Sequence, residues 1–165
     1  MIQKDYAMSE DQIIDQIIHS FLKYNLRDIQ EINNNKLDFT IAEFILCSCF
    51  IDQISGFRYN KEKVGERYRD FVQEYLPQYN SIKLYEDLQN KLVHNYSICN
   101  FYGLTRNAVN LHLQNVNGKI IINLENFIED LKVAFDRYIF QLKNDAIIRQ
   151  NASNWYSKNK ILSLL

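Results

Sequence analysis

The chain is poor in residues that break helices and in residues that cross-link a fold or bind metal. Its 165 residues include a single proline, Pro77, and four glycines, so few positions interrupt a helix. The three cysteines are an odd set, and the spacing of Cys47 and Cys49 inside an apolar run matches neither a disulfide framework nor a zinc site. With three scattered histidines and no phosphate-binding glycine loop, the sequence predicts no metal and no cofactor. The cysteines are expected to be buried free thiols of a reducing compartment.

The chain also lacks an excess of either charge and a long uninterrupted apolar run. A formal net charge of −1 excludes a basic footprint for nucleic acid over the whole surface and leaves a local basic site open. The most apolar run, residues 39–54, is interrupted by Glu43 and Asp52 and is too short to span a bilayer. The first residues lack the apolar core of a signal peptide. We therefore expect a cytoplasmic protein without membrane contact.

Apolar side chains, by contrast, are abundant enough to build one core. Hydrophobic residues make up 47% of the chain and aromatic residues 13%, whereas disordered chains are poor in both. The length is that of one domain, which we expect to span residues 1–165.

Apolar residues recur at helical spacing through most of the chain. Two capping boxes, Ser9 to Gln12 and Thr40 to Glu43, mark the starts of the first two helices. The first helix is expected to restart at Leu26, and the second, apolar over more than half its circumference, to be the central helix and to end near Gly56. The predicted helices cover about 9–32, 40–56, 64–76, 81–94 and 124–142, with a short addition near residue 155.

One segment has the alternation of a strand. Val109, Leu111 and Leu113 alternate with polar residues, Asn117-Gly118 is a strong hairpin turn signal, and residues 119–122 supply the partner strand. The predicted fold is therefore mainly α, an antiparallel bundle of four to five helices with a small β-hairpin inserted at about 109–122.

The chemically suggestive stretch is the end of the fourth predicted helix. Glu86, Asn90 and His94 are spaced i, i+4, i+8 and would form one polar ridge, with Gln89 at its edge and Tyr96 just beyond the helix. A histidine there could serve as general acid or base. Glu86 could support His94, although a solvated acidic face is the plainer interpretation of Glu86 and its neighbour.

This stretch resembles the signature of the HEPN superfamily, whose members are helical bundles. The family motif is an Arg, often followed by Asn, then a few variable residues and a His, and a toxin-like branch adds a Tyr two residues later. Gln89, Asn90, His94 and Tyr96 stand at the matching positions. The resemblance covers about thirteen residues. It implies metal-independent RNA cleavage, a homodimer whose two motifs share a cleft, and in the toxin-like branch a nucleotidyltransferase antitoxin that targets the tyrosine.

The sequence departs from the family where the motif arginine is replaced by Gln89. Glutamine carries no charge and cannot make the forked ionic contact of a guanidinium with phosphate. Losing one transition-state donor costs about 3–4 kcal/mol, so we expect weak or absent ribonuclease activity. Arg58, Arg67 or Arg69 could replace the missing cation from a neighbouring element.

Two other classes of function remain open at this stage. In a non-enzymatic interaction domain, His94 would be a structural residue near the helix end and Tyr96 a core or interface residue. A nucleotide-binding helical domain is the third possibility. A basic cluster is formed by Lys61, Lys63, Arg67 and Arg69. Because acidic residues are interleaved with it, we interpret it as ordinary surface charge on a helix.

Overall fold

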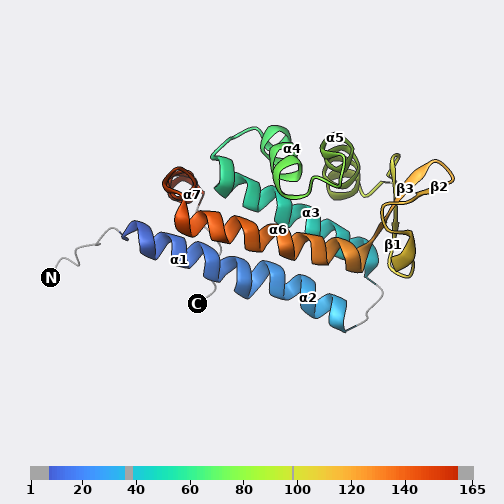
Figure 1. Ribbon diagram of the computed structural model, residues 1–165, viewed down its shortest axis with the longest axis horizontal. Coiled ribbons are helices and arrows are strands. Elements are labelled where there is room, and N and C mark those ends of the chain that lie inside the picture. Colours follow the sequence, from blue (N-terminus) through green and yellow to red (C-terminus); the bar gives the residue numbers. More distant parts are fainter. Residues whose placement is uncertain (1–7, 36–38, 98, 160–165) are drawn as a thin grey trace.

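The computed structural model describes residues 8–35, 39–97 and 99–159 and confirms the predicted fold class. Within these residues the chain forms six helices and a small mixed three-stranded sheet (Figure 1). The first helix, the central helix and the helix of residues 124–144 run lengthwise past one another, the other helices are seen nearly end-on, and the sheet projects from one end of the bundle. The tail helix expected near residue 155 is present as a full helix of 13 residues.

The first helix is a continuous rod made of α1 (Glu10–Ser20), a π-helical segment η1 (Phe21–Leu26) and α2 (Arg27–Asn34). The predicted capping box is formed: Ser9 Oγ accepts the Gln12 N–H at 3.2 Å, and the Ser9 N–H donates to Gln12 Oε1 at 2.8 Å. The expected restart at Leu26 is instead the end of the π-helical turn, which widens the helix without breaking it.

The central helix is α3 (Thr40–Tyr59), which packs against α2, α4, α6, α7 and the fourth helix. It ends at Asn60 in the left-handed conformation, φ 51°, rather than near Gly56. Gly56 lies inside the helix, where Trp155 of α7 packs on it and leaves no room for a side chain; a Cβ there would lie 2.5 Å from the indole ring. The second capping box was a wrong prediction, since Phe39 holds the cap position and the Glu43 side chain is buried.

Burial explains the composition of this helix. Of the helices in the described residues, α3 has the length and apolar character that could cross a membrane, and 56% of its apolar stretch is buried in the bundle. A core helix has the same composition. Cys47 is buried as expected, but Cys49 faces outward from α3 and is exposed, which corrects that prediction.

The remaining helices follow the predicted order. Helix α4 (Val64–Tyr75) stops before Pro77, and α5 (Ser81–Leu84) begins at Asn80, whose side chain accepts the Lys83 N–H. From there the fourth helix continues as a π-helical segment, η2 (Tyr85–Val93). Helices α6 (Leu124–Asn144) and α7 (Ala146–Lys158) close the bundle, with Asp145 capping α7.

The sheet has the order β1-β3-β2, with β1 (Tyr102–Thr105) parallel to β3 (Lys119–Asn123) and β2 (Asn115–Val116) antiparallel to it. The Asn117-Gly118 turn forms as predicted, with φ of 52° and 83°. The strand predicted from Val109 was wrong, because Val109–Leu111 form a short 3₁₀ turn, η3, and pairing with β3 begins only after it. Strand β1 was not predicted, since four residues containing a glycine carry no alternation.

Candidate functional site

Gln89 and Asn90 of the motif lie on the π-helical segment η2, and His94 and Tyr96 lie just beyond its end. Hydrogen bonds from i to i+5 widen each turn, and along this stretch Glu86 and Asn90 are partly exposed and His94 is exposed. The Glu86 carboxylate accepts from Lys83 Nζ at 2.8 Å rather than from His94. Asn90 is half-buried, and its carbonyl accepts the Asn95 side-chain N–H at 2.7 Å. Among the described residues, no hydrogen bond links Glu86, Asn90 and His94.

Gln89, at the position of the family's arginine, points into the bundle. Its side chain is 3% exposed. Ser48 Oγ of α3 donates to Gln89 Oε1 at 2.9 Å and lies 3.0 Å from the Tyr68 hydroxyl. Gln89 Nε2 lies 3.4 Å from Asp52 Oδ2. Gln89 is therefore a member of a buried polar network that joins the fourth helix to α3 and α4.

An arginine does approach this network, but its charge is already paired. Arg67 Nη2 donates to Asp52 Oδ1 at 2.5 Å, and its other nitrogens reach the carbonyls of residues 52, 61 and 62. The guanidinium carbon also lies 5.0 Å from the centre of the Trp155 ring. Arg58 is bound to Glu74 and Tyr75, and Arg69 lies over Tyr85. None of the three candidate cations offers a free guanidinium beside Gln89.

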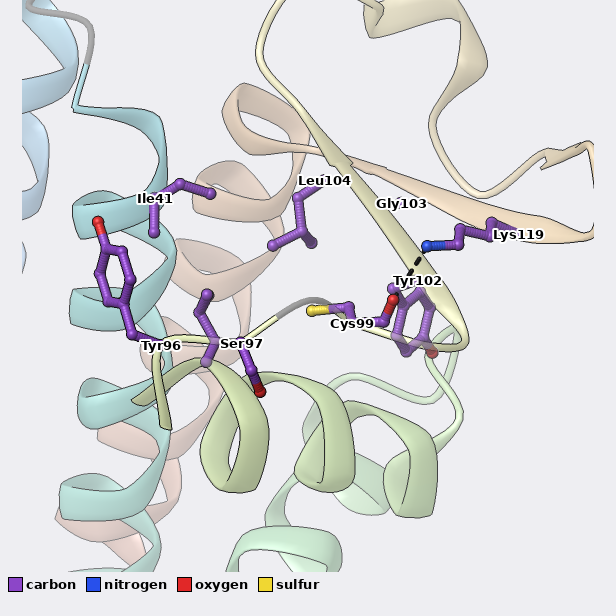
Figure 2. Close-up of a pocket in the computed structure, with 9 residues that line it drawn as sticks. Ile41, Tyr96, Ser97, Cys99, Tyr102, Gly103, Leu104 and Lys119 are labelled. Atoms are coloured by element: carbon purple, nitrogen blue, oxygen red, sulfur yellow. Dashed lines mark hydrogen bonds between the residues drawn. The ribbon is translucent and has the colours of Figure 1, made fainter. Parts of the chain in front are cut away.

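His94 and Tyr96 lie at the surface, where the fourth helix ends. The Tyr96 N–H donates to the Leu92 carbonyl and the Ser97 N–H to the Lys91 carbonyl, each at 3.0 Å, and these bonds satisfy two of the carbonyls at the helix end. Tyr96 ends this turn in the left-handed conformation, with φ 49°, and is 72% exposed at the mouth of an apolar pocket (Figure 2). Glycine is the usual residue at this position because a bulky side chain is strained there. The fold alone therefore does not account for a tyrosine.

Replacing Tyr96 by glycine is expected to stabilise the protein by about 1 kcal/mol, because the left-handed strain is removed and little burial is lost. Chemical denaturation with fluorescence or circular dichroism measures the change. Tyr96→Phe is the matched control, since it keeps the strain and should leave stability unchanged. A clear loss of stability in Tyr96→Gly would mean that the ring holds the fold together.

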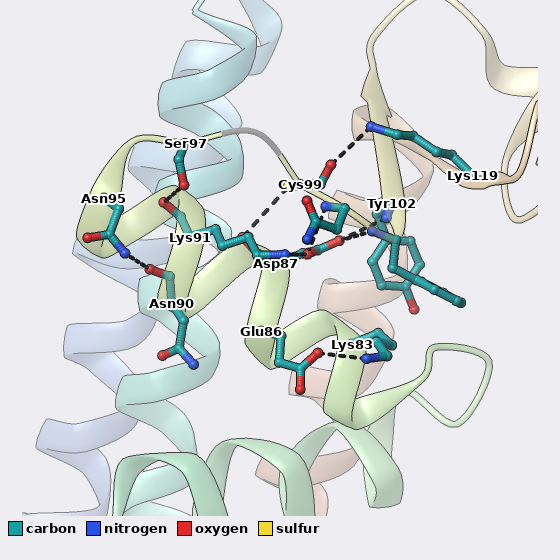
Figure 3. A network of polar contacts seen from close by, with 12 residues as sticks. Lys83, Glu86, Asp87, Asn90, Lys91, Asn95, Ser97, Cys99, Tyr102 and Lys119 are labelled. Carbon is teal, nitrogen blue, oxygen red and sulfur yellow. Dashed lines mark hydrogen bonds and ion pairs between the residues drawn. The ribbon is translucent and has the colours of Figure 1, made fainter.

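The strongest polar centre near the motif is Asp87, which sequence reasoning placed on a solvated face. Asp87 is 1% exposed. Its carboxylate accepts the backbone N–H groups of Asn100, Phe101 and Tyr102 at 2.7–3.0 Å and Lys91 Nζ at 3.0 Å (Figure 3). Burial by itself would raise the pKa of Asp87, but these donors outweigh it and hold the pKa below its usual range. Asp87 thus fastens the start of β1 to the fourth helix.

A second polar cluster, around His112, was not predicted from the sequence. The Tyr79 hydroxyl donates to Asp130 Oδ2 at 2.6 Å and lies 3.1 Å from His112 Nε2. The Asn123 N–H donates to His112 Nδ1 at 3.1 Å, which places the imidazole proton on Nε2. Burial and the bond to Asp130 raise the pKa of Tyr79. These residues come from four separate segments, and no spacing in the sequence links them.

Comparison with known proteins finds no matching family model, curated protein or solved structure. The resemblance to HEPN domains thus rests on Gln89, Asn90, His94 and Tyr96 and on the helical fold. Of these four residues, the structure leaves His94 and Tyr96 exposed, Asn90 half-buried and Gln89 buried.

Proposed function

We propose that the chain is a HEPN-like domain whose RNA-cleavage motif is degenerate and catalytically silent. The observation that carries the proposal is the inward orientation of Gln89. In a cleaving site the residue at this position must hold a phosphate whose charge develops in the transition state. Gln89 is uncharged, buried and already bonded to Ser48 beside Asp52, so it supplies neither charge nor a free donor.

His94 remains available as a general base on an exposed helix end. Without a cationic partner, however, nothing stabilises the charge that develops on the phosphate. General acid or base catalysis by one positioned group contributes about 10²- to 10⁴-fold. Rate enhancements by enzymes start at about 10⁶-fold. A toxin or defence role, if retained, would then act by binding RNA, a second copy of the chain or a nucleotidyltransferase-type partner rather than by cleavage.

Purified protein incubated with structured and unstructured RNA is expected to cleave neither above the background of the His94→Ala variant. Gln89→Arg is expected to gain no activity, because the new guanidinium would lie beside Asp52 and Arg67 inside the bundle. Product formation resolved on denaturing gels gives the measurement, with metal chelator present. Cleavage by the wild-type chain that disappears in His94→Ala would overturn the proposal of a silent site.

The second candidate is a non-enzymatic interaction domain that is unrelated to RNA cleavage. The strained, exposed Tyr96 beside an apolar pocket favours it. The two candidates differ in oligomeric state and in RNA binding. If the chain is a HEPN-like domain, we expect a dimer in light scattering and RNA binding that is weaker in His94→Ala. A monomer that does not bind RNA supports the interaction domain.

A further inference from the structure

A cavity of about 240 Å³ opens beside the C-terminal end of the fourth helix (Figure 2). The first turn of α3 contributes Ile41, the fourth helix Leu92, and strand β1 Leu104. Tyr96 lies at its edge near Ile41. The lining is mostly apolar, and apolar cavities of this kind favour an apolar ligand body over water.

Three polar lining residues each make a hydrogen bond within the protein. Ser97 Oγ donates to the Lys91 carbonyl at 3.2 Å, and Cys99 Sγ lies 3.6 Å from the Asp87 carbonyl as its donor. The Tyr102 hydroxyl accepts the Asn80 N–H at 3.0 Å. Burial raises the pKa of the Cys99 thiol to about 11, so the thiol stays neutral. These groups present little polarity to the cavity.

Lys119 of β3 is the single cation that lines the cavity within the described part of the chain. Its ammonium donates one bond, to the Cys99 carbonyl at 3.0 Å (Figure 2). An ammonium carries three donors, and among the described residues no acidic side chain lines the cavity to neutralise it. A ligand in this otherwise apolar cavity would therefore need a hydrogen-bond acceptor, preferably an anion, beside Lys119.

We propose that this cavity is a binding site for a small monocarboxylate with a compact apolar or aromatic body. The carboxylate pairs with Lys119, and the body lies against Ile41, Leu92 and Leu104. The size fits, since a cavity of roughly 150 Å³ accommodates benzene and the volume here leaves room for a ring with a short side chain. Neither RNA cleavage nor an intact motif arginine is needed for this site.

The probe is 3-phenylpropanoate, compared with uncharged 3-phenylpropan-1-ol, titrated into the full chain and followed by amide NMR shifts. A ligand of this size is expected to bind in the roughly millimolar range. The acid should bind about tenfold more tightly than the alcohol, and the shifts should centre on Gly103, Leu104 and Lys119. Lys119→Met should remove that preference, whereas Lys132→Met on the outer side of α6 should keep it.

Ile41→Trp is expected to abolish binding of both compounds by filling the mouth of the cavity, and Leu104→Phe tests the same point from the sheet side. Dispersed amide spectra establish that each variant is folded. The proposal is overturned if neither compound shifts the NMR signals of the cavity residues at a ligand concentration 10-fold above a roughly millimolar dissociation constant. It is also overturned if the acid and the alcohol bind equally tightly, or if Lys119→Met leaves the ratio of their affinities unchanged. Shifts that centre on another surface would equally contradict it.

Discussion

Replacing Asp87 by alanine is expected to lower the free energy of unfolding by about 3–5 kcal/mol. The change removes the common acceptor of three backbone N–H groups and leaves the Lys91 ammonium without its partner. Buried donors without partners cost about 1–3 kcal/mol each. For a chain of this length the melting temperature should fall by about 10 °C, measurable by calorimetry.

The neighbouring carboxylate is the control for this prediction. Glu86→Ala removes a half-exposed ion pair with Lys83, which is expected to cost no more than about 0.5 kcal/mol. Hydrogen exchange should localise the defect of Asp87→Ala to residues 100–102 and to β3, which pairs with β1. If both variants lose the same small amount of stability, the Asp87 contacts do not hold the sheet.

The lowered pKa of Asp87 also predicts a pH dependence. A carboxylate whose pKa is lower in the folded state stabilises the fold above its unfolded value of about 3.9, and this contribution is lost as the pH falls through the folded value. The wild-type chain should therefore lose more stability than Asp87→Ala between about pH 5 and pH 2.

Replacing Arg106 by methionine is expected to cost a similar 3–5 kcal/mol at neutral pH, because it leaves a buried carboxylate without its counter-charge. Glu43 on α3 is 0% exposed, and Arg106, in the loop after β1, donates to it. Methionine keeps the aliphatic volume of the arginine stem, so the loss reports on charge rather than packing. Equilibrium denaturation at several pH values measures it.

The pH dependence of this second variant has the opposite sign. Burial raises the pKa of Glu43 above its usual value, and the charge of Arg106 offsets only part of that rise. A carboxyl with a raised folded pKa contributes stability below its unfolded value, and this contribution is lost as the pH rises. The defect of Arg106→Met should thus shrink from pH 8 to pH 5. Adding Glu43→Gln should restore stability at neutral pH.

The exposed pair of Arg27 and Asp28 is the matched control for charge removal, since both side chains are half-exposed. Arg27→Met is expected to change stability by less than about 0.5 kcal/mol. If Arg106→Met behaves in the same way, with no recovery at pH 5, Glu43 is not held as a buried charge.

The candidate site was predictable in position but not in orientation. The spacing of Gln89, Asn90, His94 and Tyr96 located it at a helix end, and the structure has the end there. The π-helical form of this stretch was not predicted, because apolar periodicity does not reveal such a change in hydrogen bonding. Gln89 and Asp87 were judged by their neighbours in sequence, yet Ser48, Asp52 and the start of β1 decide their environment.

By itself the sequence determined the helical class, the order of the helices, the first capping box and the Asn117-Gly118 turn. Each depends on contacts within a few residues, where periodicity and capping act. Only the tertiary structure decided that Glu43, Asp87 and Gln89 are buried, that β1 joins the sheet, and that Lys119 lines an apolar cavity. Those outcomes depend on partners that are distant in the sequence, such as Arg106, 63 residues from Glu43, and burial of a polar group is favourable only when such partners meet it.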